Sequence, residues 1–184
     1  MPGTAAKQLN ISRPIVLIGL MGAGKSTVGR RLAKKLGLAF IDSDDEIEKA
    51  AGCTIEDIFE LYGEAAFRQG EKRVMERLLD EPPMVLATGG GAFMNADIRT
   101  KVLAKGTTVW LKAGLEALFE RTSRRGGRPL LNTDDPRKTL EKLINERYPV
   151  YEEAPIIIDT DLETLESTVD RIVDALKAST GTDA

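Results

Sequence analysis

The sequence of 184 residues contains no histidine. Histidine is the side chain that most often acts as a general base near neutral pH, and it is also the commonest ligand of transition metals. Its absence removes both possibilities together. Any acid–base chemistry must therefore use Asp, Glu, Lys, Tyr or water.

Cysteine is nearly absent as well, since Cys53 is the only one. A single cysteine excludes an intramolecular disulfide, and nothing in the composition indicates an oxidising compartment. Residues 1–10 lack the apolar stretch of a signal peptide, and no run approaches the roughly 18 apolar residues of a membrane span. We therefore expect a cytoplasmic protein without a membrane partner.

The sequence also lacks a strong excess of either charge, because 26 basic residues face 29 acidic ones and the net charge is −3. Nucleic-acid binding normally needs a basic surface, so we expect no nucleic-acid partner. The composition, 42% hydrophobic and 30% charged, is typical of a globular protein of about one domain. We expect a single domain over residues 1–184, with loose termini at 1–10 and 179–184.

Short apolar runs alternate with helical patterns along the chain. This alternation predicts an α/β fold in which helices flank both faces of a parallel sheet. The expected strands are 15–18, 39–41, 84–87, 107–111 and 156–158. The expected helices are 27–36, 54–62, 64–79, 95–104, 115–122, 136–146 and 162–177, with T-x-x-D at 54 and Asp135-Pro136 as capping signals.

Residues 19–27 read GLMGAGKST, which contains the pattern G-x-x-x-x-G-K-[ST] between an expected strand and an expected helix. This context predicts a phosphate-binding loop whose backbone N–H groups surround phosphates at a helix N-terminus. A glycine-rich turn without a ligand is the alternative. Lys25 would reach the outer phosphates, and the Ser26 hydroxyl would help to hold Mg²⁺. The expected nucleotide contacts are Gly22, Ala23, Gly24, Lys25, Ser26 and Thr27.

Two acidic residues, Asp42 and Asp44, follow the second expected strand. Ligands of open α/β sheets bind at the carboxyl ends of the strands, so both carboxylates are expected to face the phosphate loop. Asp42 could hold Mg²⁺ directly or through water, and Asp44 could orient a hydroxyl acceptor or accept its proton. Alternatively, either carboxylate could cap the next helix, and spacing alone does not decide between these roles.

Gly89, Gly90 and Gly91 follow the third expected strand at the same edge of the sheet. Three glycines allow a close approach of backbone to ligand and can expose N–H groups as donors. A tight turn would need only one or two glycines. The third glycine therefore favours a loop that faces a ligand.

Arg68 and Arg147 lie on or beside expected helices. Taken singly, Arg68 is expected to pair with Glu64 or Glu71 on the surface, and Arg147 to cap the last carbonyls of a helix that Pro149 ends. If both arginines converge on one place, they form a clamp for a carboxylate, because guanidinium groups bind carboxylates through two parallel hydrogen bonds.

The segment 123–134, SRRGGRPLLNTD, has a composition that disfavours regular structure. We expect a mobile loop. Beside a phosphate loop, its arginines Arg124, Arg125 and Arg128 favour a lid over a triphosphate, where an arginine stabilises charge during phosphoryl transfer. A solvated run of charge is the alternative.

Six motifs in order resemble those of shikimate kinases: GLMGAGKST, Asp42-Ser43-Asp44, GEAAFRQGE (63–71), ATGGG (87–91), RGGRPLL (125–131) and ERYPVYEEA (146–154). The resemblance covers residues from about 15 to 160. It implies a three-layer P-loop fold like that of the nucleoside-monophosphate kinases, with a five-stranded parallel sheet in the order 2-3-1-4-5 and a lid.

The resemblance also implies roles for individual residues. Asp44, Arg68, Gly90 and Arg147 would contact shikimate, with both arginines on its carboxylate and Asp44 on its ring hydroxyls. Arg128 would act on the transferring phosphate. Arg121 would lie beside the adenine, and Ser26 and Asp42 would serve Mg²⁺.

On this basis we expect an ATP-dependent kinase, a monomer, that phosphorylates the 3-hydroxyl of shikimate with Mg²⁺ as cofactor. Lys25, Asp44 and Arg128 are the expected catalytic residues, and Gly89 and Gly91 join the shikimate contacts. Two alternatives remain at this point. One is a related small-molecule kinase, for gluconate or a nucleoside monophosphate, and the other is a nucleotide-binding module without turnover.

Overall fold

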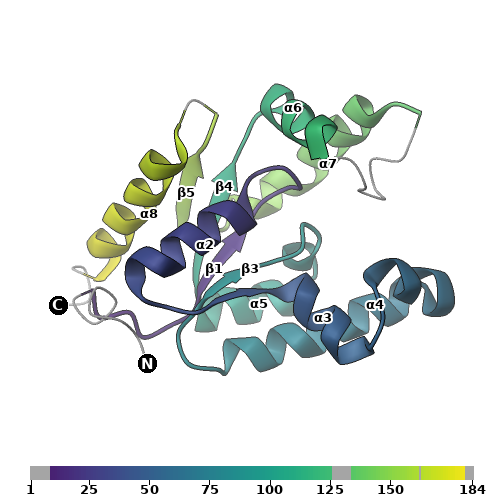
Figure 1. Cartoon of the computed structure of the whole chain (residues 1–184), viewed down its shortest axis with the longest axis horizontal. Coiled ribbons are helices and arrows are strands. Elements are labelled where there is room, and N and C mark those ends of the chain that lie inside the picture. Colours follow the sequence, from purple (N-terminus) through teal and green to yellow (C-terminus); the bar gives the residue numbers. More distant parts are fainter. Residues whose placement is uncertain (1–8, 126–133, 162, 181–184) are drawn as a thin grey trace.

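The structure, a computed structural model, describes residues 9–125, 134–161 and 163–180. Its centre is a five-stranded parallel sheet with the order β2-β3-β1-β4-β5, as the resemblance implied (Figure 1). The strands are β1 (Ile15–Ile18), β2 (Phe40–Asp42), β3 (Val85–Ala87), β4 (Thr107–Lys112) and β5 (Ile156–Asp159). The predicted α/β fold class is confirmed.

The register of the sheet aligns the carboxyl ends of three strands. Leu17 of β1 pairs with Ala87 of β3, and Ala87 pairs with Asp42 of β2. The phosphate loop, the Asp42-Ser43-Asp44 triplet and the triple glycine each begin within a few residues of this row. They therefore lie at one edge of the sheet.

The helices cover both faces because successive connections run toward opposite edges of the sheet. From β1 it crosses to β2 through α2 (Lys25–Leu36), whereas from β3 it crosses the other way to β4 through α5 (Ala96–Lys105). Right-handed crossovers in opposite directions place these helices on opposite faces. Figure 1 shows α8 (Leu165–Thr180) beside α2, and α4 (Ile55–Leu79) packs beside α5. A ligand crevice is expected outside β1 and β3, where the two directions separate.

The described residues also form α3 (Ser43–Ala51), the 3-10 helix η1 (Ala92–Met94), α6 (Leu115–Arg125) and α7 (Pro136–Tyr151). Both predicted capping signals are confirmed. The Thr54 hydroxyl accepts a hydrogen bond from the Asp57 N–H at 3.1 Å. The Asp135 carboxylate accepts one from the Lys138 N–H at 3.2 Å, with Pro136 as the first residue of α7.

The two helices predicted at 54–62 and 64–79 are the two arms of α4, which kinks at Gly63. Gly63 has φ 84° and ψ 172°, a backbone conformation that glycine adopts without the steric cost of a β-carbon. The kink separates a short arm near the cleft from a long arm that packs on α5.

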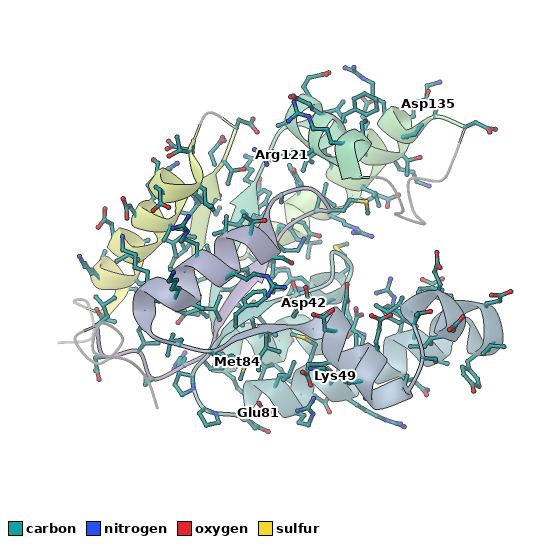
Figure 2. All side chains as sticks on the ribbon, in the orientation of Figure 1. Asp42, Lys49, Glu81, Met84, Arg121 and Asp135 are labelled. Atoms are coloured by element: carbon teal, nitrogen blue, oxygen red, sulfur yellow. The ribbon has the colours of Figure 1, made fainter. Side chains whose placement is uncertain are left out.

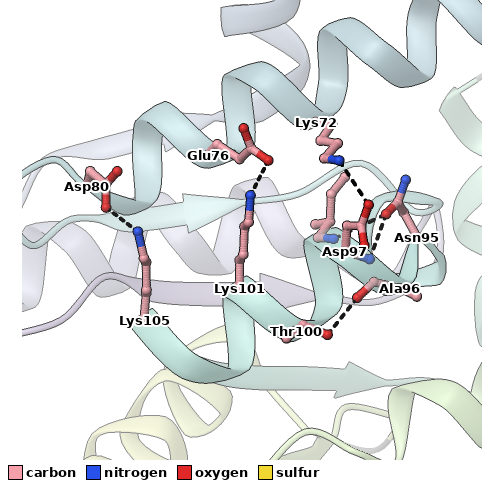
Figure 3. A network of polar contacts seen from close by, with 10 residues as sticks. Lys72, Glu76, Asp80, Asn95, Ala96, Asp97, Thr100, Lys101 and Lys105 are labelled. Atoms are coloured by element: carbon pink, nitrogen blue, oxygen red, sulfur yellow. Dashed lines mark hydrogen bonds and ion pairs between the residues drawn. The ribbon is translucent and has the colours of Figure 1, made fainter.

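Three ion pairs fasten the long arm of α4 to α5, as Figure 3 shows. Lys72 pairs with Asp97 at 2.9 Å between Nζ and Oδ2. One turn further along both helices Glu76 pairs with Lys101, and another turn on Asp80 pairs with Lys105. The partners recur every four residues on each helix, which places them on one face.

Helix α7 runs five residues beyond its predicted end at 146, through Pro149 to Tyr151. Aromatic packing stabilises this last stretch, because the Trp110 ring lies 4.8 Å from the Tyr148 ring and 5.7 Å from the Tyr151 ring, centroid to centroid. The proline removes one backbone donor without ending the helix. The interpretation of Arg147 as a cap after the end of a helix is therefore wrong.

Some residues expected in loose termini belong to the folded structure. Helix α8 continues to Thr180, and Leu9 packs against the core. Residues 123–125 belong to α6, whereas most of the predicted lid, 126–133 with Arg128, lies outside the described residues. Among the helices that the structure describes, none is both long enough and apolar enough to cross a membrane.

Candidate active site

The phosphate loop adopts the backbone that its glycines allow. Gly22 has φ 83° and Gly24, the residue before α2, has φ 94°, both in the left-handed region. A β-carbon on Gly22 would lie 2.9 Å from Cγ2 of Thr122, so α6 packs directly against the loop. The loop leads into the N-terminus of α2, where free N–H groups and the helix dipole attract anions.

Lys25 bends back across the loop. Its Nζ donates hydrogen bonds to the carbonyl oxygens of Gly19 at 2.6 Å and Leu20 at 3.0 Å. The ammonium group is thus held where the loop begins, next to the residues that would surround a phosphate. Gly22, Ala23, Gly24, Lys25, Ser26 and Thr27 all line one cleft.

Asp42 caps α3 with one carboxylate oxygen and contacts Ser26 with the other. Its Oδ1 accepts a hydrogen bond from the Asp44 N–H at 2.9 Å and so caps α3. Its Oδ2 accepts a hydrogen bond from the Ser26 hydroxyl at 3.2 Å. The two oxygens expected to serve Mg²⁺ are therefore adjacent, at the start of α2.

Asp44 is largely buried and surrounded by charge. Burial raises its pKa to about 6, and the neighbouring carboxylates of Asp42 and Glu71 add to the increase, while Lys25 opposes it. A carboxyl group with this pKa is mostly ionised at neutral pH yet can accept a proton readily. Asp44 also lines the cleft that contains the phosphate loop.

The triple glycine leaves room for three charged side chains. A β-carbon on Gly89 would lie 2.8 Å from Asp44 Oδ1, and one on Gly90 would lie 3.0 Å from Arg147 Nη1. A β-carbon on Gly91 would lie 2.9 Å from Arg68 Nη1. Consecutive residues of one loop thus contact Asp44, Arg147 and Arg68, and the convergence of the two arginines is confirmed.

Arg68 also makes the pairs that its helical spacing predicted. Its Nη1 lies 2.9 Å from Glu71 Oε1, and its Nε lies 3.7 Å from Glu64 Oε1. Glu71 is buried, however, so this pair belongs to the cleft and not to an outer surface. Burial raises the pKa of Glu71, whereas the positive charges of Arg68 and Arg147 lower it.

Arg147 is buried on α7, 9% exposed. Its Nη1 has no hydrogen-bond partner among the residues that the structure describes. A buried guanidinium N–H without a partner is costly, and a bound anion would satisfy it. This atom is the one that approaches Gly90.

Arg121 ties the other side of the phosphate loop to the end of the sheet. It donates to the carbonyl oxygens of Gly22 at 3.3 Å and Thr160 at 3.2 Å. In the view of Figure 2, Arg121 on α6 and Asp42 at the end of β2 lie on either side of α2. Both line the same cleft, and Arg121, the residue expected beside the adenine, borders the phosphate loop.

One continuous cleft of about 1440 Å³ contains all these groups. It extends from Arg121, Thr160 and Leu165 along the phosphate loop to Phe59, Arg68 and Arg147. This volume exceeds that of most single small-molecule sites, which span roughly 300–1,000 Å³. Two ligands can therefore lie end to end.

Several residues of the site were missed in the sequence. Glu71 has the spacing of a surface partner of Arg68, and this spacing carries no sign of its burial. Ser43, whose hydroxyl accepts a hydrogen bond from the Gly89 N–H at 3.2 Å, joins the acidic triplet to the triple glycine. Phe59 and Thr160 line the cleft without any motif of their own.

The fold and the cleft are those of a P-loop kinase for a small molecule. A family model described as shikimate kinase matches residues 21–177. The shikimate kinase of Paramagnetospirillum magneticum is 56% identical over 166 residues, which cover 90% of this chain and 85% of that protein. The shikimate kinase of Caulobacter vibrioides is 53% identical, over 90% of this chain and 83% of that protein.

Solved structures agree with the sequence relatives. A shikimate kinase from Acinetobacter baumannii in complex with shikimate has a TM-score of 0.89 and 39% identity, over 95% of this chain and 98% of that one. A gluconokinase from Sinorhizobium meliloti has a TM-score of 0.61 at 21% identity and shares the fold alone. The chain belongs to the shikimate kinase family, so the resemblance and the ATP-dependent kinase class are confirmed.

Proposed function

We propose that this protein transfers the γ-phosphoryl group of ATP to the 3-hydroxyl of shikimate, giving shikimate 3-phosphate and ADP. One observation carries the proposal: Asp44, Arg147 and Arg68 meet at consecutive glycines of a single loop, in the cleft that also contains the phosphate loop. The two arginines suit a carboxylate and Asp44 suits a hydroxyl. Shikimate carries both groups.

The arginines, Glu71 and the triple glycine each contribute to binding of the acceptor. Arg147 and Arg68 bind the carboxylate of the acceptor, and Arg147 Nη1 gains the partner that the described residues do not supply. Glu71 holds the Arg68 guanidinium through its contact at 2.9 Å. Gly89, Gly90 and Gly91 keep the backbone close to the acceptor, because a side chain at any of the three would occupy space that a charged group needs.

Asp44 orients the acceptor hydroxyl and accepts its proton late in the reaction. Phosphoryl transfer passes through a loose transition state, which depends on positioning and charge neutralisation more than on a strong base. A pKa of about 6 leaves most Asp44 side chains ionised at pH 7. The group can then accept the hydrogen bond of the hydroxyl that attacks.

Donor binding uses the other half of the cleft. Backbone N–H groups of residues 22–27 and the Lys25 ammonium bind the phosphates, and Arg121 lies against the adenine. Arg128, outside the described residues, is proposed to neutralise charge on the transferring group, as the family resemblance implies. We further propose that the protein acts in the cytoplasm as a monomer.

The residues fit a magnesium ion. Ser26 and Asp42 offer two oxygen ligands 3.2 Å apart beside the phosphate loop, and Mg²⁺ prefers oxygen ligands, often one or two from the protein with the rest from phosphates and water. When bound, the ion would neutralise negative charge on the β- and γ-phosphates. The side chains of Ser26 and Asp42 would hold it, directly or through water.

An acceptor panel in a coupled ADP-release assay tests the proposed function. The panel contains shikimate, gluconate, a nucleoside monophosphate and shikimate methyl ester, which lacks the carboxylate charge. We expect shikimate to be the only efficient acceptor and the ester to have a strongly raised KM. Efficient turnover of gluconate or the nucleotide would replace the proposal with a related kinase, and no ADP release with any acceptor would indicate a binding module.

A further inference from the structure

Tyr151 lies behind the acceptor site and does not line the cleft. It belongs to the last turn of α7, one helical turn after Arg147, and its side chain is fully buried. Its phenol donates a hydrogen bond to the carbonyl oxygen of Gly90. Tyr151 therefore connects the helix that carries Arg147 to the glycine that faces Arg147.

Gly90 occupies the junction between the two halves of the cleft. A β-carbon there would lie 3.0 Å from Arg147 Nη1 on one side, and 3.7 Å from the Gly19 carbonyl oxygen and 3.9 Å from the Met21 nitrogen on the other. Because a peptide unit is planar, holding the Gly90 carbonyl also fixes the N–H of Gly91. The orientation of this single peptide thus decides what the loop presents to an acceptor.

The hydroxyl and the ring of Tyr151 have separable tasks. The ring packs against Trp110 at 5.7 Å and Phe93 at 6.2 Å between centroids, contacts that a phenylalanine would keep. The hydroxyl donates to the Gly90 carbonyl and also accepts a hydrogen bond from the Arg147 side chain, which opposes the effect of burial on its pKa. Burial raises the pKa of Tyr151, so the phenol keeps its proton and remains a donor at neutral pH.

Ser43 holds the preceding glycine. Its buried hydroxyl accepts the Gly89 N–H at 3.2 Å, so two hydroxyls from different helices hold two peptides of the loop, Thr88–Gly89 and Gly90–Gly91. Ser43 fixes the side of the loop that faces Asp44, and Tyr151 fixes the side that faces Arg147. Without the phenol, the Gly90–Gly91 peptide would lose its hydrogen bond to α7, and the Ser43 bond to the Thr88–Gly89 peptide would remain.

We propose that the Tyr151 hydroxyl is a positioning group for acceptor binding, because it fixes the Gly90 peptide against Arg147 while its ring serves the core. The inference rests on the proposed function. It concerns the acceptor and not ATP, since the hydrogen bond ends at the loop that carries the acceptor contacts. Tyr151 acts through Gly90 and Arg147, and it touches neither substrate.

The test compares Tyr151→Phe with a matched control, Tyr148→Phe, in steady-state kinetics with shikimate and ATP. Tyr148 lies in the same helix and packs on the same Trp110 ring, but its hydroxyl donates to the Ala113 carbonyl after β4. We expect Tyr151→Phe to raise the KM for shikimate about three- to tenfold, the effect of one lost hydrogen bond, with kcat and the KM for ATP within about twofold. Tyr148→Phe should leave all three unchanged.

Both variants lose one hydroxyl bound to a backbone carbonyl, so a purely structural role predicts similar behaviour. Thermal unfolding and the emission of Trp110, the only tryptophan, check that each variant retains the aromatic cluster. Calorimetric titration with shikimate gives the affinity without turnover, even where activity is low. An unchanged shikimate affinity in Tyr151→Phe, or equal losses in both variants, overturns the inference. A wild-type protein inactive with shikimate would instead overturn the proposed function.

Discussion

Asp44 and Gly89 fit together so closely that a β-carbon on the glycine would lie 2.8 Å from the Asp44 carboxylate oxygen Oδ1. The same added atom would lie 3.5 Å from Glu71 Oε2. The carboxylates of Asp44 and Glu71 therefore occupy the space beside the glycine loop, and position 89 has no room for a side chain.

Replacement of Gly89 by alanine is expected to displace Asp44. Overpacking of this kind costs about 1–3 kcal/mol, so we expect a rise of about tenfold or more in the KM for shikimate and a lower melting temperature. Gly70→Ala is the control, since nothing lies within 4 Å of the added atom in α4. That variant should be more stable by about 0.5–1 kcal/mol with unchanged kinetics. Normal kinetics for Gly89→Ala would show that Asp44 tolerates displacement.

Asp44→Asn is expected to raise the free energy of unfolding and to lower the activity. The pKa of Asp44 is raised from its usual value to about 6, so the native state binds this proton more tightly than the unfolded state. The wild type therefore gains stability as the pH falls from about 6 toward 4. At pH 7.5 the variant, which carries no charge to desolvate, should exceed the wild type by about 1–3 kcal/mol in free energy of unfolding.

Urea unfolding at pH 7.5 and pH 5 measures this difference, which should narrow at the lower pH. Wild-type kcat/KM should fall below about pH 6 as Asp44 becomes protonated, and Asp44→Asn should lose most of its turnover. Asp45→Asn, at the exposed neighbouring position, should retain activity. An equally active Asp44→Asn variant would contradict the assigned role.

Arg147→Lys preserves the charge but removes the planar fork that binds a carboxylate through two hydrogen bonds. The loss of a charged hydrogen bond is worth about 1.5–3 kcal/mol, which corresponds to a rise of about ten- to hundredfold in the KM for shikimate with a smaller change in kcat. Arg137→Lys, exposed near the start of α7, is the matched control. If both variants behave like the wild type, Arg147 does not bind the carboxylate.

Asp42→Asn separates the two roles of this side chain. Asparagine caps helices as well as aspartate does, so the N-terminus of α3 should remain stable, whereas the charge beside Ser26 is lost. We expect the Mg²⁺ concentration for half-maximal activity to rise about ten- to hundredfold. Asp135→Asn changes the cap of α7 in the same way and should not alter this concentration. Equal Mg²⁺ dependence in both variants would leave Asp42 as a cap alone.

Arg128→Ala tests the residue assigned by family resemblance to the transferring phosphate. An interaction made mainly in the transition state lowers kcat when it is removed and leaves substrate KM values nearly unchanged. We expect a fall of about a hundredfold or more in kcat, since arginines that neutralise this charge contribute about 10³–10⁵ in related reactions. Arg137→Ala serves as the control, and a higher KM for ATP with normal kcat would assign Arg128 to binding instead.

The sequence identified the groups that follow strands, and the sheet explains why. Parallel strands place their carboxyl ends together, so the phosphate loop, Asp42, Asp44 and the triple glycine could be assembled from the order of the motifs. Arg68 and Arg147 project from helices, α4 and α7, whose relative placement no local pattern reveals. The family resemblance alone predicted that these two side chains converge, and the structure confirms that they do.

The errors have a common physical cause, which is packing between distant residues. Pro149 is a strong local signal for the end of a helix, but Tyr148 and Tyr151 pack on Trp110 and stabilise α7 beyond it. Glu71 has the spacing of an ordinary surface partner for Arg68, and only the packing around α4 makes it buried. Tertiary contacts outweighed local preference in both cases.

The strand order determines when the site can assemble during synthesis. β1 is made first but lies at the centre of the sheet, between β3 and β4, and is flanked on both sides only after Thr107–Lys112 has been made. Contacts between residues so far apart in sequence form slowly, because long loops must close first. The phosphate loop is therefore the earliest of these motifs to be synthesised, and it acquires its neighbouring strands only after the chain has been made as far as Thr107–Lys112.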